Sequence, residues 1–83
     1  MNYLILSCYD SMYRSEALVI REEKMDYYYL SEDERKQLMD DDRCWFDMDN
    51  VRDYLKKHDL LPCNVIDCTD GTADITYVDK YSC

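Results

Sequence analysis

Carboxylates, from 19 Asp and Glu residues, are the most abundant ionisable side-chain groups in this 83-residue sequence. Segment 22–53 holds 12 acidic residues against five basic ones, and it also holds five aromatic residues. Carboxylates beside aromatic rings can bind the Arg and Lys side chains of a partner by charge pairing and cation–π contact. We therefore expect a partner-binding surface here, with the candidate residues Glu32, Asp33, Glu34, Asp40, Asp41, Asp42, Asp47, Asp49, Tyr28 and Trp45. The alternative is that the aromatic residues pack in the core while the acids only solvate two helices.

Two aspartates in this segment also form a short motif. The run Phe46-Asp47-Met48-Asp49-Asn50-Val51 resembles the nucleophile motif of the haloacid-dehalogenase phosphatases, an apolar residue followed by Asp-x-Asp. In that family the first Asp attacks phosphorus, the second handles the proton, and magnesium lies between them. The resemblance covers six residues, and the chain is too short for that family's Rossmann-like core. We expect Asp47 to cap a helix instead.

Four soft ligands, Cys44, His58, Cys63 and Cys68, are enough in number for a structural zinc site. Their spacing does not match the paired, closely spaced ligands of zinc knuckles. His58 also suits the C-terminal end of a helix, and the cysteines suit small core positions. We expect no cofactor, and a zinc-stabilised structural or regulatory module is the alternative.

The formal net charge of −9 indicates which class of partner the protein attracts. It repels phosphate backbones and anionic membranes, so we expect no direct nucleic-acid or membrane binding, and a basic protein as the partner. The five cysteines fit reduced thiols in a cytoplasm, because we find no secretory signal before Cys8. No Gly-rich phosphate loop or nucleophile–base pair is evident, so we do not expect an enzyme.

The length predicts a single domain over residues 1–83. Residues 3–8 are apolar and rich in strand formers, which indicates a buried first strand. Residues 17–21 and 27–30 favour a β-hairpin, although a helix over 15–25 is the alternative, because Ser15 could cap it.

Two helices and a second hairpin follow. The sequence Ser31-Glu32-Asp33-Glu34 is a capping box that predicts a helix from Glu32 to about Asp41. A second helix is expected after Asp47 and before Pro62. Thr69-Asp70-Gly71-Thr72 between two β-favouring runs, 64–68 and 73–78, predicts a hairpin. The result is an α+β fold in the order β-ββ-αα-ββ, with a small antiparallel sheet of about four to five strands covered on one face by the helices.

In size, acidity and lack of catalytic motifs, the chain resembles the small inhibitors that phages and mobile elements encode. These include anti-CRISPR and anti-restriction proteins, some of which mimic DNA, and toxin-neutralising immunity proteins have the same character. The resemblance implies an inhibitor in the cytoplasm of a bacterial host. Its carboxylates would occupy the basic nucleic-acid-binding surface of a nuclease or Cas effector.

Overall fold

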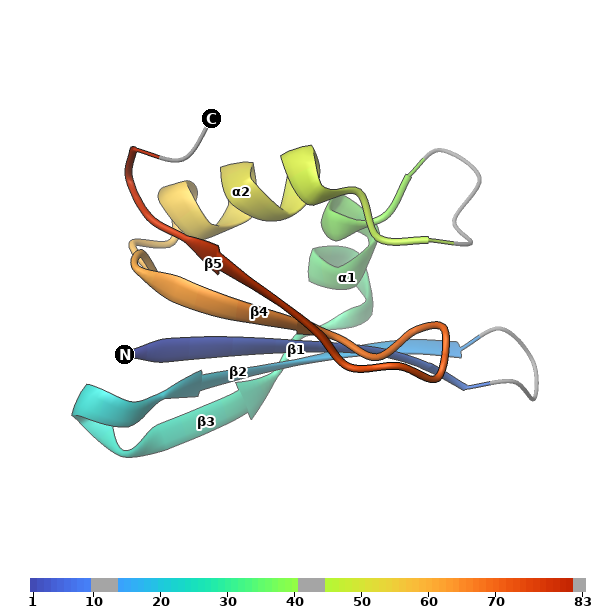
Figure 1. The fold of residues 1–83 in the computed structure, drawn as a ribbon, viewed down its shortest axis with the longest axis horizontal. Helices are drawn as coiled ribbons and strands as arrows, with labels where there is room; N and C mark the ends of the chain where they lie inside the picture. The colour runs from blue at the N-terminus through green and yellow to red at the C-terminus, as the bar shows by residue number, and fades with distance from the viewer. Residues whose placement is uncertain (10–13, 41–44, 82–83) are drawn as a thin grey trace.

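A five-stranded sheet and two α-helices form the fold in the computed structural model, which describes residues 1–9, 14–40 and 45–81 (Figure 1). The α+β class and the order β-ββ-αα-ββ are confirmed. In chain order the elements are β1 (Asn2–Tyr9), β2 (Arg14–Arg21), the 3-10 turn η1 (Glu22–Lys24), β3 (Asp26–Tyr29), α1 (Glu32–Leu38), α2 (Met48–Lys57), β4 (Cys63–Asp67) and β5 (Asp74–Val78).

The sheet is mixed rather than wholly antiparallel, which corrects the expectation from sequence. Its strand order is β3-β2-β1-β4-β5, and β1 pairs with β4 in parallel, whereas the other three pairs are antiparallel. Parallel neighbours need a long crossover connection. The two helices lie between β3 and β4 in the chain and supply that crossover, so β4 runs in the same direction as β1.

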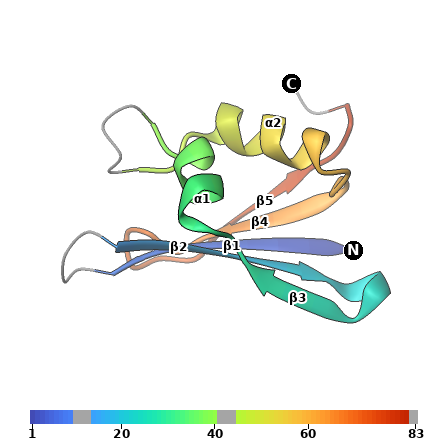
Figure 2. The ribbon, with the colours of Figure 1, turned by 180° about the vertical axis from the view of Figure 1, so that it is seen from behind.

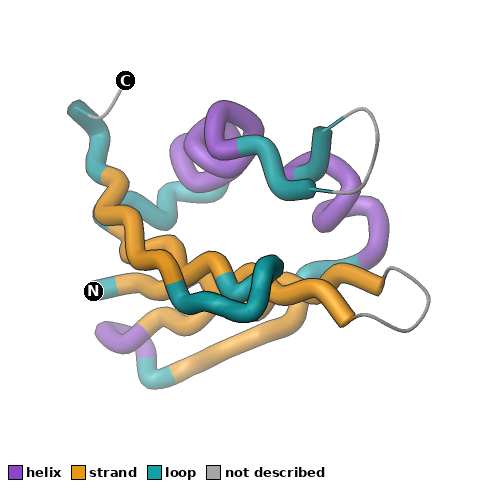
Figure 3. The backbone as a smooth tube through the Cα atoms, turned by 45° about the vertical axis from the view of Figure 1, so that its right-hand side comes forward, coloured by secondary structure: helices purple, strands orange, loops and turns teal. Residues whose placement is uncertain are grey.

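Both helices lie on the same face of the sheet, as Figures 2 and 3 show from two further directions. Alternate residues of the strands point toward them, and these side chains are buried together with the inner face of α2. The burial of apolar side chains between the two layers is the main stabilising contribution to the fold. The core comprises Leu4, Leu6, Ala17, Val19, Leu30, Leu38, Val51, Tyr54, Leu55, Leu60, Cys63, Val65 and Val78.

Local signals fix most of the element ends. Residues 15–21 form a strand and not the alternative helix, and η1 follows them directly. Helix α1 stops at Leu38 rather than near Asp41, because Met39 leaves the helix in an extended conformation and forms an isolated bridge with Phe46. The backbone N–H of Asp47 donates to the Leu38 carbonyl (2.9 Å), which joins the end of α1 to the start of α2.

The predicted second hairpin is also present. Strands β4 and β5 flank a turn in which Gly71 has a φ of +86°, a conformation that glycine adopts at little cost. The side chain of Asp67 accepts hydrogen bonds from the Thr69 backbone N–H (3.0 Å) and hydroxyl (2.7 Å). Asp70 binds Thr72 in the same way. These carboxylates therefore shape the turn.

The other face of the sheet carries no helix in the described chain (Figures 1 and 2). Strand alternation places ten mainly apolar residues on it. We call this set the open sheet face: Tyr3, Ile5, Leu18, Ile20, Tyr27, Tyr29, Asn64, Ile66, Ile75 and Tyr77. Its central members are half-buried by their neighbours, while those on the edge strands β3 and β5 are exposed.

Candidate functional site

The acidic first turn of α1 is built around the capping box. The Ser31 hydroxyl accepts from the Glu34 backbone N–H (3.2 Å), and the Ser31 backbone N–H donates to Glu34 Oε1 (3.2 Å). The other carboxylate oxygen, Oε2, accepts from the Tyr54 hydroxyl on α2 (3.0 Å). The hydrogen bond from the Ser31 backbone is the largest cause that lowers the pKa of Glu34. Glu34 thus holds α1 to α2 and contributes to the fold itself.

Replacing Ser31 with Ala is expected to lower the free energy of unfolding by about 1 kcal/mol, because a Ser N-cap is worth about 0.5–2 kcal/mol. Urea denaturation followed by circular dichroism measures the change. Ser31→Asp is the matched control, since Asp also caps helices well, and it should retain most of the stability. Equal losses in both variants would show that the cap does not hold α1.

Helix α2 begins with a second capping carboxylate, as expected from sequence. Asp47 Oδ1 accepts from the Asp49 backbone N–H (2.8 Å), so the Asp47 side chain is used by the helix. Asp49 itself is exposed and forms an ion pair with Arg52 (3.2 Å). On α1, Glu32 forms a longer ion pair with Lys36 (3.7 Å). Such surface pairs contribute little to stability, so Asp49 and Glu32 remain accessible to a competing cation.

The remaining candidates lie in different environments. Asp33 is exposed on α1, whereas Asp40 is half-buried after the end of that helix. Trp45 is 57% exposed and precedes α2. Tyr28 points to the helix-covered face and packs against the core, with the Arg21 guanidinium 5.8 Å from its ring centre. Two further candidates, Asp41 and Asp42, lie outside the described residues.

The structure therefore separates the candidates into two groups. The first turn of α1 lies beside the middle of α2, as the Glu34–Tyr54 contact shows. The acids at the start of α2 lie instead near the C-terminal end of α1, where Asn50 Nδ2 donates to the Met39 carbonyl (3.0 Å). A shallow groove of about 200 Å³ is lined by Gln37 of α1 and by Asn50, Asp53, Tyr54 and Lys57 of α2. Asp53 is exposed there, and sequence reasoning had not included it among the candidates.

The possible zinc ligands have other roles in the described chain. Cys63 is 1% exposed in the core, and burial raises the pKa of its thiol to about 12. The His58 ring lies against Tyr54, with 4.2 Å between ring centres. Cys68 is half-buried just after β4, and Cys44 lies outside the described residues. The described part of the chain contains no cluster of three or more His, Cys, Asp or Glu side chains suited to a metal ion.

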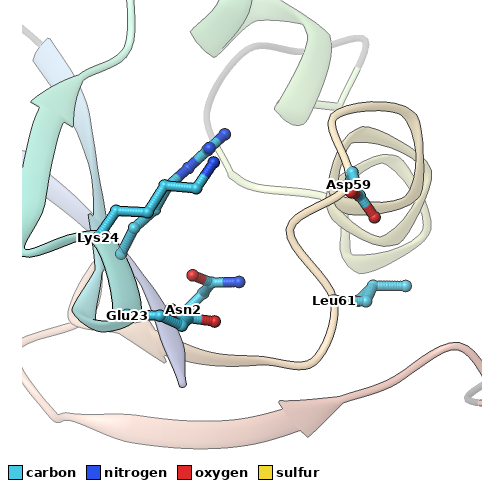
Figure 4. Close-up of a pocket in the computed structure, with 6 residues that line it drawn as sticks. Asn2, Glu23, Lys24, Asp59 and Leu61 are labelled. Carbon is cyan, nitrogen blue, oxygen red and sulfur yellow. The ribbon is translucent and has the colours of Figure 1, made fainter.

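A second hollow, of about 240 Å³, opens beside η1 (Figure 4). Lys24 and Glu23 lie on one side of it, and Asp59 and Leu61 lie on the other, in the segment after α2. Two basic side chains, Arg21 and Lys24, and two acidic ones, Glu23 and Asp59, line this hollow, so its formal charges cancel.

The open sheet face is the largest feature that sequence reasoning missed. The alternation of Tyr27 with Tyr29, and of Ile75 with Tyr77, was the available signal, because each pair lies on one face of its strand. These four side chains are 70%, 64%, 67% and 52% exposed, in the same order. They account for half of the exposed large hydrophobic residues in the described chain.

Within the described residues, neither α-helix has the length and apolar character needed to cross a bilayer. Comparisons with models of known protein families, with curated protein sequences and with solved structures find no match to this chain.

Proposed function

We propose that this protein acts by binding, and that exposed carboxylates of α1 and α2 occupy a basic, nucleic-acid-binding surface of another protein. The observation that supports the proposal most directly is the set of exposed carboxylates on α1 and α2, one of which, Asp53, lines the groove between the helices. Asp33 and Asp53 are exposed, and Asp49 and Glu32 are held only by surface ion pairs. The partner class that suits these groups is a nuclease or Cas-type effector in the cytoplasm of a bacterial host.

The mechanism is occlusion by charge. Carboxylates on a rigid helical layer stand in for phosphates, while an exposed aromatic such as Trp45 can stack on an Arg side chain of the partner. Electrostatic steering makes such association fast at low salt and slow at high salt. Glu34 and Asp47 act indirectly, because their carboxylates cap the helices that present the other acids.

The test measures whether this protein displaces a labelled DNA duplex from each of a panel of purified basic nucleases, at 50 and 500 mM NaCl. For a nuclease that this protein inhibits, the double variant Asp33→Lys, Asp53→Lys is expected to bind at least tenfold more weakly. The reason is that two attractive charges become repulsive. Association of the unmodified protein should also slow at least tenfold between the two salt concentrations.

The matched control reverses the same number of charges elsewhere. Glu22 and Glu23 are exposed in η1, which connects β2 to β3 and lies outside the helical layer. The double variant Glu22→Lys, Glu23→Lys changes the net charge by the same amount. This control should keep most of the inhibition. If both double variants lose binding equally, net charge rather than the helical layer is responsible. If salt has no effect, the charge mechanism is wrong.

A further inference from the structure

The open sheet face consists of two rows that cross all five strands. The first row runs through β3, β2, β1, β4 and β5 as Tyr29, Leu18, Ile5, Ile66 and Ile75. The second row runs in the same order as Tyr27, Ile20, Tyr3, Asn64 and Tyr77. Nine of these ten side chains are aliphatic or aromatic. The rows therefore form one continuous apolar surface opposite the helices.

The inner strands have the composition of strands covered on both faces. Tyr3-Leu4-Ile5-Leu6 in β1 and Ala17-Leu18-Val19-Ile20 in β2 are unbroken apolar runs. An antiparallel strand with one face in water normally alternates apolar and polar residues, whereas continuous runs are typical of strands buried on both sides. Within these two runs, the helices cover Leu4, Leu6, Ala17 and Val19. The composition of β1 and β2 therefore indicates that a second layer covers their other face.

Charge is nearly absent from this face. Among the described side chains, strand alternation places Glu16 there, opposite Ser7 and beyond one end of the two rows. At the other end Met1 contacts Asn64, and its ammonium group forms surface ion pairs with Glu22 and Glu23. The acids of α1 and α2 lie in the helical layer on the opposite side of the sheet. Two copies of the chain can thus meet through their open sheet faces while the carboxylates of α1 and α2 point away from the interface.

Base stacking of a single-stranded nucleic acid is a poorer fit to the same tyrosines. Such sites combine aromatic side chains with a positively charged groove that follows the backbone. The described side chains of the open sheet face include no Lys or Arg. The net charge of −9 adds a repulsion against phosphate.

We propose that the open sheet face binds the same face of a second copy of this chain, forming a two-fold symmetric dimer. Strand β1 is the middle strand of the five, so a two-fold axis across the sheet centre places β1 against its counterpart. The apolar inner strands β2, β1 and β4 then pack together, and the tyrosines of the edge strands border the interface. Each copy contributes the same patch, as an isologous interface requires.

The area is sufficient for a weak, specific dimer. Five strands about 4.8 Å apart, with two rows of side chains, describe a patch of about 350 Å² in projection. Side-chain relief increases the accessible area, so two copies would bury about 1,000 Å² in total. That value is close to the lower bound for a biological interface. An interface near this bound is expected to be weak, so its detection requires protein concentrations up to several hundred micromolar.

Salt separates this proposal from the proposed function, on which it does not rest. Dimerisation brings together two molecules that each carry a charge of −9 and buries apolar surface, so higher salt screens the repulsion and strengthens the dimer. Binding of the helical layer to a basic partner has the opposite dependence, because salt screens an attraction. Either interaction can thus be present without the other.

Sedimentation equilibrium from 1 to 500 µM, at 50 and 500 mM NaCl, tests the dimer. The average mass is expected to rise from 10.1 kDa toward twice that value, at lower concentration in high salt. The variants Ile5→Lys and Ile5→Glu should each weaken self-association at least tenfold, because like charges meet across the two-fold axis. An equimolar mixture of the two variants should restore a dimer, because opposite charges then meet.

Variants with exposed side chains keep the test decisive if a charge at Ile5 prevents folding. Tyr29 and Ile75 are 64% and 67% exposed, so Tyr29→Lys with Ile75→Lys should fold normally and still weaken the dimer at least tenfold. Gln37→Lys, exposed on α1, is the control and should dimerise normally. A wild-type mass of 10.1 kDa over the whole range would overturn the proposal. So would tight binding of a 20-nucleotide poly-dT strand by the monomer, since that would assign the tyrosines to base stacking.

Discussion

Leu55→Ala is expected to lower the free energy of unfolding by about 2–5 kcal/mol, the range for truncating a fully buried Leu. Leu55 is 0% exposed, and it lies on the face of α2 that packs against the sheet. Its carbonyl also accepts from the Leu60 backbone N–H (2.9 Å), where the chain leaves the helix. A domain of this size has a total stability of about 4–12 kcal/mol. This one substitution therefore removes a large fraction of the stability.

Urea denaturation followed by the circular dichroism of the helices measures the loss. Lys56→Ala is the matched control, because Lys56 is exposed on the same helix and its replacement should change stability by less than about 0.5 kcal/mol. A loss below about 1 kcal/mol for Leu55→Ala would mean that α2 does not pack on the sheet as described.

Cys63 is expected to resist alkylation in the folded protein by about a thousandfold relative to the unfolded chain. Its thiol is 1% exposed, and burial raises its pKa to about 12. The thiolate is the reactive form, and an ordinary Cys has a pKa of about 8.5. At pH 8 the folded protein therefore holds about a thousandfold less Cys63 thiolate. Iodoacetamide labelling in buffer and in 8 M urea, followed by tandem mass spectrometry of the Cys63 site, measures the protection.

Cys68 serves as the internal control, because it is half-buried just outside β4 and should be labelled earlier in the folded protein.

The raised pKa of Cys63 also makes the stability of the fold depend on pH. Cys63 is neutral in both states below about pH 8.5, and between that value and about pH 12 only the unfolded state loses the proton. The stabilising effect of the neutral thiol is thus lost as the pH rises through this window. In Cys63→Ala the free energy of unfolding should therefore decline less steeply with pH in this window. In the labelling experiment, equal labelling of Cys63 and Cys68 in the native state would contradict the burial of Cys63.

Sequence patterns of short range predicted the local structure well. The capping box at Ser31, the N-cap at Asp47 and the turn at Gly71 are all present, because each depends on residues within four positions of one another. The end of α1 was placed too late. Its stop at Leu38 depends on the bridge between Met39 and Phe46, and Phe46 lies beyond the helix itself.

Long-range features were not accessible in the same way. The parallel pairing of β1 with β4 has no local signature, so the sheet was expected to be antiparallel. The apolar run of β1 was interpreted as fully buried, and the sequence alone does not say which face the helices leave open. Among the site residues, the acidic character of Glu34 and Asp47 was evident from sequence. That their carboxylates are used within the fold depends on backbone N–H groups and, for Glu34, on Tyr54 of α2.

The parallel pair at the centre of the sheet also joins strands that are far apart in the sequence, which slows folding. Strand β1 leaves the ribosome first, but its neighbour β4 follows only after two further strands and both helices. Closing such a long loop is slow, because chain entropy is lost before the contact forms. A β1–β2–β3 meander formed before that contact would leave the backbone groups of the β1 edge unpaired, and such an edge can pair with the same edge of another chain. Refolding yield should therefore fall with protein concentration, as β4 competes with intermolecular pairing for the edge of β1.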